Sequence, residues 1–196
     1  MSEPQTPPPG TPNTPEAAEA PAPTLAFRPA GPNDAVLIGR LVHEAFERAD
    51  ETKLVGKLRT SDDFALELVA TDGANILGHV QFTHARLADS EEALSIVILA
   101  PLSVRPDMQR KGIGSALVEA ALERLRHDRI DMVVVLGDPA YYTRFGFSAA
   151  LGEKFDTPWP GPEFMALELR DGAAASLKSG DAPVKLTFTE ALVAAG

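Results

Sequence analysis

The chain has no cysteine, few aromatic residues and fewer basic than acidic side chains. Without cysteine there can be no disulfide, thiolate metal site or cysteine nucleophile, and a reducing compartment is compatible with this composition. No apolar run approaches the ~18 residues that a membrane-spanning helix requires. The first residues lack the basic and apolar regions of a secretory signal, and a formal net charge of −10 disfavours nucleic-acid or anionic-membrane partners. We therefore expect a cytoplasmic protein that binds no metal, nucleic acid or membrane.

The chain does have a proline-rich beginning. Residues 1–24 hold eight of the 17 prolines, three glutamates and no lysine or arginine. Such a segment buries too little apolar surface to offset the entropy lost on ordering. We predict a disordered tail over 1–24 and one folded domain over 25–196, since 44% of the 196 residues are apolar. The alternative function for the tail is to dock as a proline-rich ligand on a partner protein.

Apolar periodicity predicts an alternation of helices and strands in the folded part. Helices are predicted at 34–47, 51–58 and 112–128 with a short helical piece at 140–145, and strands at 25–29, 64–71, 75–84, 93–99, 132–136, 164–169 and 184–188, with a loop at 170–181. The apolar strands 93–99 and 132–136 suit a parallel pair joined by a right-handed helical crossover. Pro101 cannot donate to a strand ladder, so it marks a bulge or the end of pairing.

Two glycines, Gly112 and Gly114, stand where the central helix is predicted to begin. Glycine lets a ligand approach the backbone closely, and the first helical turn has N–H groups without partners. Together with the helix dipole these groups favour an anion, above all phosphate, and Arg110 and Lys111 add positive charge. The spacing fits neither a P-loop nor a three-glycine Rossmann fingerprint. The alternative is that the glycines only close a tight turn.

Two stretches resemble the signatures of the GNAT superfamily of acyl-CoA-dependent N-acetyltransferases. Gln109–Gly114 resembles its pyrophosphate loop, Gln/Arg-x-x-Gly-x-Gly/Ala. Tyr142–Phe147 resembles its second signature, Leu-Tyr-x-Lys-x-Gly-Phe, with Arg144 in place of the lysine and Tyr141 in place of the leucine. The chain is similar to the YhbS-like branch of predicted acetyltransferases, most densely from Leu99 to Phe147.

The resemblance implies an α/β (α+β) fold with a mixed, mostly antiparallel central sheet and helices on both faces. Strands 93–99 and 132–136 would splay apart, and acetyl-CoA would bind in the gap as a co-substrate. The cofactor-binding residues implied are Leu102, Ser103, Val104, Gln109, Arg110, Lys111, Gly112, Ile113, Gly114, Ser115, Tyr142 and Arg144. A non-catalytic module that binds or senses acyl-CoA is the alternative function.

The implied chemistry is direct attack of an amine on the thioester carbon. The Val104 amide is the candidate oxyanion donor, and Tyr142 the candidate proton donor to the leaving thiolate, unless it only packs against the cofactor. Strand 95–99 has no carboxylate to serve as a base, which leaves Glu92, His79 and His84 as candidates. The alternative for each is a position on the surface, or a structural role in which its hydrogen bonds are already made.

The acceptor is expected to be an amine of a small molecule or a peptide. Exposing the neutral form of a lysine amine at pH 7 costs about 4.6 kcal/mol, against about 1.4 kcal/mol for an α-amine. A site poor in bases therefore favours an amine of low pKa. The segments expected to contact the acceptor, 47–59 and 155–163, contain no sequence motif that identifies it. For the oligomeric state, the sequence is compatible with both a monomer and a homodimer.

Overall fold

The computed structural model describes residues 25–46, 49–88, 94–177 and 182–195. The predicted tail and Glu92 lie outside these ranges. The strands are β1 (Ala26–Pro29), β2 (Phe64–Thr71), β3 (Ile76–Leu87), β4 (Ile96–Val104), β5 (Met132–Leu136), β6 (Phe155–Asp156), β7 (Phe164–Glu168) and β8 (Val184–Thr187). The helices are α1 (Ala35–Phe46), α2 (Ala49–Arg59), α3 (Ile113–His127), α4 (Pro139–Tyr142), α5 (Ala149–Gly152) and α6 (Glu190–Val193), with short 3₁₀ helices at Pro32–Asp34, Pro106–Met108, Thr143–Phe145 and Ala174–Ser176.

One sheet with the order β1-β2-β3-β4-β5-β7 forms the centre of the molecule. Its neighbouring strands are antiparallel except β4 and β5, which are parallel and joined by α3 as predicted. The far end of β3 pairs with β8, and β8 pairs in parallel with β6. The prediction of a mixed, mostly antiparallel sheet is confirmed.

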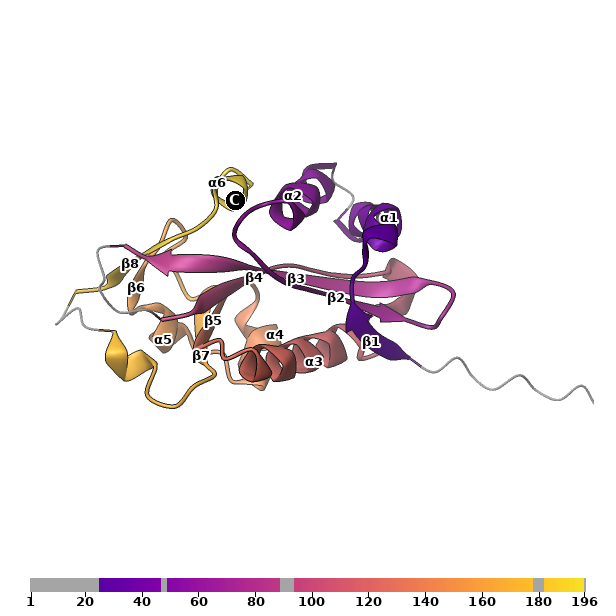
Figure 1. Ribbon diagram of the computed structural model, residues 1–196. Helices are drawn as coiled ribbons and strands as arrows, with labels where there is room; N and C mark the ends of the chain where they lie inside the picture. The colour runs from indigo at the N-terminus through magenta and orange to yellow at the C-terminus, as the bar shows by residue number, and fades with distance from the viewer. Residues whose placement is uncertain (1–24, 47–48, 89–93, 178–181, 196) are drawn as a thin grey trace, which may run out of the picture.

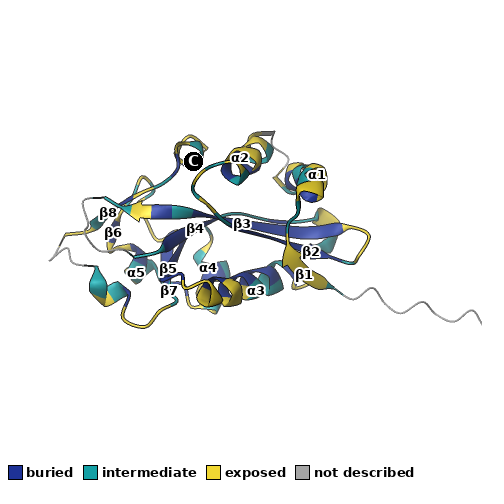
Figure 2. Ribbon diagram, viewed as in Figure 1, coloured by how far each residue is buried: buried dark blue, intermediate teal, exposed yellow. Residues whose placement is uncertain are grey.

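Helices cover both faces of this sheet, with α3 on one side and α1 and α2 on the other (Figure 1). The apolar positions of α3 recur at helical spacing and all are buried: Ile113, Leu117, Val118, Ala121, Leu122 and Leu125. They pack on Val80 and Phe82 of β3. Figure 2 shows the central strands of the sheet buried between the layers, whereas the edge strand β1 is exposed. Burying each large apolar side chain contributes roughly 1.5–3 kcal/mol. Among the described residues, every helix is too short or too polar to cross a lipid bilayer.

The two parallel strands separate partway along their length. Pairing of β4 with β5 runs from Ile96 opposite Met132 to Leu99 opposite Val135. Beyond Leu99, β4 continues to Val104 and remains paired with β3. The edge of β4 that faces β5 therefore loses its strand partner after Leu99, which gives the predicted splay.

A β-bulge lies at the point of separation. Leu99 faces Phe82 and Leu102 faces Val80, so β4 carries one extra residue there, at Ala100-Pro101. Pro101 thus marks both a bulge, toward β3, and the end of pairing, toward β5. The predicted end of this strand at residue 99 was wrong, because pairing with β3 resumes after the bulge.

Candidate active site

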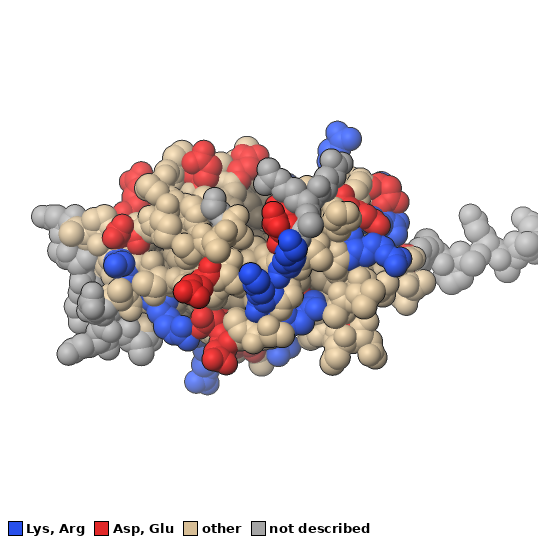
Figure 3. Space-filling model, turned by 90° about the horizontal axis from the view of Figure 1, so that it is seen from above, with Lys and Arg blue, Asp and Glu red and all other residues tan. Residues whose placement is uncertain are grey.

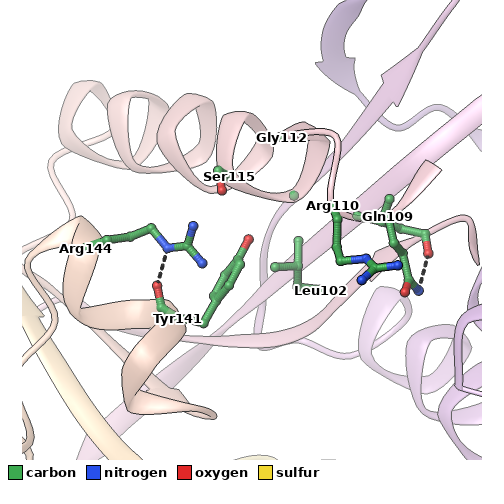
Figure 4. A pocket seen from close by; sticks show the side chains of 9 residues that line it. Leu102, Gln109, Arg110, Gly112, Ser115, Tyr141 and Arg144 are labelled. Atoms are coloured by element: carbon green, nitrogen blue, oxygen red, sulfur yellow. Dashed lines mark hydrogen bonds between the residues drawn. The ribbon is translucent and has the colours of Figure 1, made fainter.

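A pocket of about 640 Å³ lies where the free edge of β4, the first turn of α3 and the segment from α4 to Phe145 meet (Figure 4). It is lined by Leu102, Val104, Gln109, Arg110, Gly112, Gly114, Ser115, Tyr141 and Arg144. Most of these residues belong to the site predicted from the sequence. The pocket therefore brings together the end of β4 and both signature stretches.

The N-terminal end of α3, which we call the helix mouth, presents backbone donors to the pocket. Gly112 is the N-cap residue, with φ of 85° and no side-chain cap. The N–H groups of the first turn have no intrahelical partner, as in any helix, and no side-chain cap from Gly112, so they point out of the helix end. Arg110 also has a left-handed backbone, with φ of 60°, a conformation that is uncommon outside glycine and often found at ligand sites. The loop and helix mouth together form a concave surface whose backbone donors suit an anion.

Gly114, in the first turn of α3, faces the wall of the pocket that Tyr141 and Val104 form. A Cβ atom at this position would come within 2.9 Å of the Tyr141 hydroxyl and 3.4 Å of a Val104 methyl group. Only glycine leaves this space open. The residues present therefore fit a pyrophosphate at the helix mouth.

Two arginines supply positive charge to the pocket. Arg110 lies on the loop before α3, and Arg144 approaches from the far side (Figure 4). The Arg144 guanidinium is 4.1 Å from the centre of the Tyr141 ring, and its Nε donates to the Tyr141 carbonyl at 2.7 Å. These contacts hold Arg144 in place, and its cation lines the same cavity as the uncapped helix mouth.

The free edge of β4 presents peptide groups to the pocket. The Arg105 N–H donates to the Leu77 carbonyl across the strand pair, and antiparallel ladders alternate between bonded and outward-facing positions. The backbone groups of Leu102 and Val104 therefore face outward, and those of Ser103 face β3. The Gln109 amide donates to the outward Val104 carbonyl at 3.1 Å, which agrees with this assignment.

Four predicted site residues do not line the pocket. Ser103 points its side chain to the other face of the sheet, opposite His79. Lys111 is exposed beside Met108, and Ile113 is buried in the core under α3. The fourth is Tyr142, whose neighbour Tyr141 lines the pocket and was not predicted. Successive helical residues point in different directions, so only one of the two tyrosines could face the cavity, and no pattern in the sequence says which.

The Tyr142 ring is buried against Gly137. A Cβ atom on Gly137 would lie 2.4 Å from this ring, and Gly137 follows β5 just after its last pair with β4, Val135 with Leu99. Tyr142 therefore stands near the vertex of the splayed strands rather than at the helix mouth. Burial, with a smaller effect from Tyr141, raises the pKa of its phenol above the usual value, so the hydroxyl is protonated at neutral pH. Its role as proton donor stays a prediction.

Of the candidate bases, the structure describes two. His84 is half-buried and lies on the α3 face of β3 by strand alternation. His79 is fully buried on the opposite face, where its Nε2 lies 2.8 Å from Glu67. No group of three or more His, Asp or Glu side chains suited to a metal ion occurs in the described ranges.

A strand edge with free peptide groups beside an uncapped, arginine-flanked helix mouth suits a ligand with an extended amide chain and a pyrophosphate, the two parts of coenzyme A. The fold and the site together define an acyl-CoA-dependent acyltransferase of the GNAT class. In agreement, the family model described as the acetyltransferase (GNAT) domain matches residues 64–149.

Proteins of similar sequence support the assignment to this family. The chain is 38% identical over 145 residues to the uncharacterized N-acetyltransferase YhbS of Escherichia coli K12, covering 72% of this chain and 86% of the relative. It is 35% identical over 134 residues to the uncharacterized N-acetyltransferase YjhQ of the same strain, covering 67% and 74%. The chain therefore belongs to the GNAT acetyltransferase family and is an acyltransferase.

Solved structures agree with this family. The crystal structure of E. coli YhbS in complex with CoA matches with a TM-score of 0.77 and 33% identity, over 89% of this chain and 94% of that one. A GNAT family acetyltransferase from Brucella melitensis in complex with acetyl-CoA matches with a TM-score of 0.68 and 28% identity, over 87% and 99%. The predicted fold class is confirmed.

Proposed function

We propose that this protein transfers the acetyl group of acetyl-CoA to an amine of a small molecule or peptide by direct attack on the thioester. The single observation that carries the proposal is the pocket itself, which joins the outward peptide groups of Leu102 and Val104 to the uncapped mouth of α3. The complexes of relatives with CoA and acetyl-CoA support it.

The geometry of the pocket supports the following binding roles. The first turn of α3, Arg110 and Arg144 hold the pyrophosphate, and the outward groups of Leu102 and Val104 hold the amides of the pantetheine arm. This arrangement points the thioester toward the vertex of the splayed strands, where Tyr142 lies against Gly137. Holding two reactants in attack geometry can replace about 7–11 kcal/mol of the barrier, so alignment is the main contribution that we assign to the pocket.

Two groups are proposed to stabilise the negative charges that develop on the thioester oxygen and on the leaving sulfur. The Val104 N–H faces the free edge of β4 and is available to stabilise the oxyanion that develops on the thioester carbonyl. The Tyr142 hydroxyl, protonated at neutral pH, donates to the leaving thiolate. Tyr141, whose hydroxyl lies beside Gly114, is assigned to the wall of the binding site.

A titration with thermal unfolding as the readout tests the binding part. Acetyl-CoA at a hundredfold excess over its dissociation constant should stabilise the fold by about 2.7 kcal/mol. ADP has the pyrophosphate but no pantetheine arm, so it should stabilise far less at the same concentration. No shift with either acetyl-CoA or CoA would refute the assignment of the pocket.

Release of free thiol from acetyl-CoA with a panel of amines tests the chemistry. The panel should include alkylamines, arylamines and peptides with free α-amines, because these classes differ in the cost of exposing a neutral nitrogen. Thiol release above the rate without amine supports acetyl transfer. Stabilisation by acetyl-CoA with no thiol release from any amine would favour the acyl-CoA-binding module instead.

A further inference from the structure

Leu136 is a large apolar side chain that is exposed at the end of a buried strand. The other four residues of β5, Met132–Val135, are fully buried, whereas Leu136 is 43% exposed. Single exposed leucines are common on protein surfaces and need no explanation by themselves. The other exposed large apolar side chains of the described residues lie on β1, α1, β2 and α6. What distinguishes Leu136 is its place at the vertex of the splayed strands.

Leu136 follows the last pair between the two parallel strands. Leu99 of β4 lies opposite Val135 of β5, and Leu136, one residue further, pairs with Phe164 of β7. Ala100, the next residue on β4, belongs to the bulge at which β4 leaves β5. Leu136 therefore stands at the first position where the gap between β4 and β5 is open.

The side chain of Leu136 lies on the face of the sheet that α2 covers. Val134 belongs to the apolar cluster that includes Leu54 and Leu58 of α2, whereas Val135 belongs to the cluster under α3. Successive side chains of a strand point to opposite faces of the sheet. Leu136 therefore projects to the same face as Val134, on the α2 side.

The pocket proposed for acetyl-CoA occupies the other side of the vertex. Its lining residues Leu102, Val104 and Tyr141 pack against the apolar cluster under α3. In the proposed function the thioester therefore reaches the vertex from the α3 side. An acceptor that attacks it without displacing the cofactor must come from the α1 and α2 side, where Leu136 is exposed.

Leu136 has apolar neighbours on both adjoining strands. Ala100 of β4 packs against the cluster on the α2 side. Phe164 lies directly opposite Leu136 on β7 and is 1% exposed. Residues paired in this way have Cβ atoms about 4.5–5.5 Å apart on the same face. Leu136 thus presents its exposed surface between two apolar residues, at the point that the acceptor must pass.

The segments at the vertex carry carboxylates but no lysine or arginine. The Gly137 N–H donates to the Glu163 carbonyl at 2.9 Å, and Asp138 follows Gly137, so two exposed acidic residues lie beside the vertex. Segments 131–143 and 155–169 contain no basic residue. Figure 3 looks onto the α1 and α2 side, where acidic and basic side chains are interspersed, so the wider surface adds no uniform charge. The immediate surroundings favour an ammonium group and disfavour a carboxylate.

We propose that Leu136 selects acceptors in which a primary amine is carried by an apolar chain or ring without a carboxylate; this rests on the proposed function. The acceptor binds with its apolar part on Leu136, between Ala100 and Phe164, and with its nitrogen at the vertex. A polar group at the far end of the acceptor would lose water there without gaining a partner. Leu136 is a specificity-determining residue and takes no part in proton transfer.

Three amines with the same methylene chain test this selection: hexylamine, 5-amino-1-pentanol and 6-aminohexanoate. Each is a primary alkylamine, so the cost of exposing the neutral nitrogen is nearly the same. Only the far end of the chain changes, from a methyl group to a hydroxyl to a carboxylate. Release of thiol from acetyl-CoA by the full-length protein gives kcat and KM for each amine.

We expect kcat/KM to be about tenfold higher with hexylamine than with 5-amino-1-pentanol, at the low end of what one methylene group contributes in an apolar pocket. The acid 6-aminohexanoate should be the poorest acceptor of the three. The differences should lie mainly in KM, because the contact with Leu136 is the same before and during the reaction.

Leu136→Asn should remove the preference for hexylamine. The change replaces apolar surface with an amide of similar size, so kcat/KM with hexylamine should fall about tenfold, while kcat/KM with 5-amino-1-pentanol should hardly change. A purely structural defect would lower the rates with all three amines alike. The dissociation constant of acetyl-CoA should stay that of the parent, because the pocket lies on the other face.

Leu37→Asn is the matched control. Leu37 is the same residue type with the same exposed fraction, 43%. It lies on α1, where it lines a separate hollow with Asn75 and Arg105. Leu37→Asn should therefore match the parent with all three amines.

The outcomes separate this proposal from the proposed function. A parent that binds acetyl-CoA but releases no thiol with any amine refutes acetyl transfer, and the selection with it. In a parent that is active with any amine, hexylamine no better than 5-amino-1-pentanol refutes only the selection. A preference that persists in Leu136→Asn overturns the role of Leu136. If Leu136→Asn fails to fold, Leu136→Ala, which removes the same contact without adding a polar group, decides by the same comparison.

Discussion

Replacing Gly114 with valine should weaken acetyl-CoA binding by more than a hundredfold, or about 2.7 kcal/mol, while the fold remains. The first Cβ atom would already lie 2.9 Å from the Tyr141 hydroxyl and 3.4 Å from Val104. The valine methyl groups would occupy the space between the helix mouth and this wall, which the pyrophosphate needs. Calorimetric titration with acetyl-CoA and thermal unfolding without ligand measure the two effects separately.

Gly56→Val provides the matched control. Gly56 lies on the exposed side of α2, and nothing lies within 4 Å of a Cβ atom there, so the same change should leave acetyl-CoA affinity intact. Gly112 is a less direct test, because its φ of 85° makes any side chain strained even without ligand. Parent-like affinity in Gly114→Val would place the phosphate site elsewhere.

The second large effect is expected for Tyr142→Phe, which should lower kcat about a hundredfold without weakening acetyl-CoA binding. The change removes one hydroxyl and keeps the ring packed against Gly137. General acids contribute about 10²–10⁴-fold, and the lower end applies because a thiol of pKa about 8.5 leaves readily. Steady-state kinetics with an amine found by the panel, together with the acetyl-CoA dissociation constant, measures the effect.

Tyr141→Phe is the internal comparison, since it is the same chemical change one residue earlier. Its hydroxyl lines the pocket beside Gly114, so we expect a weaker affinity for acetyl-CoA and an unchanged kcat. A reversed result, with kcat lost in Tyr141→Phe and retained in Tyr142→Phe, would assign the proton donor to Tyr141. Unchanged kcat in both, with chemistry rate-limiting, would remove both tyrosines from the proton transfer.

Most elements of the fold could be predicted, because each is specified by the period of its own apolar residues. The six buried positions of α3 and the apolar run of β5 lie within short stretches of sequence. The extent of β4 could not be predicted, since Pro101 is a local signal to stop and only the partner strand β3 shows that pairing resumes. The short elements β6, α5 and α6 depend on distant contacts and have too few residues to show a period.

The site shows the same contrast between features encoded in a short stretch of sequence and features that depend on distant contacts. The loop that opens into the pocket could be located because its glycines, charges and helix start are adjacent in sequence. Which tyrosine faces the pocket depends on how α4 is rotated against Gly137, a packing property that the dipeptide does not encode. The Arg59–Glu67–His79 contacts join α2, β2 and β3, so no sequence spacing could indicate them, although His79 was among the candidate bases.

The bulge at Ala100-Pro101 has a consequence for how such a cleft can be gained or lost. Leu99 and Leu102 lie on the same face of the sheet although they are three positions apart, because the bulge absorbs the extra residue. Deleting either bulge residue would therefore keep every later side chain on its present face and remove only the bend. A single codon therefore separates the bent β4, which parts from β5 after Leu99, from a regular strand whose later side chains keep the same faces.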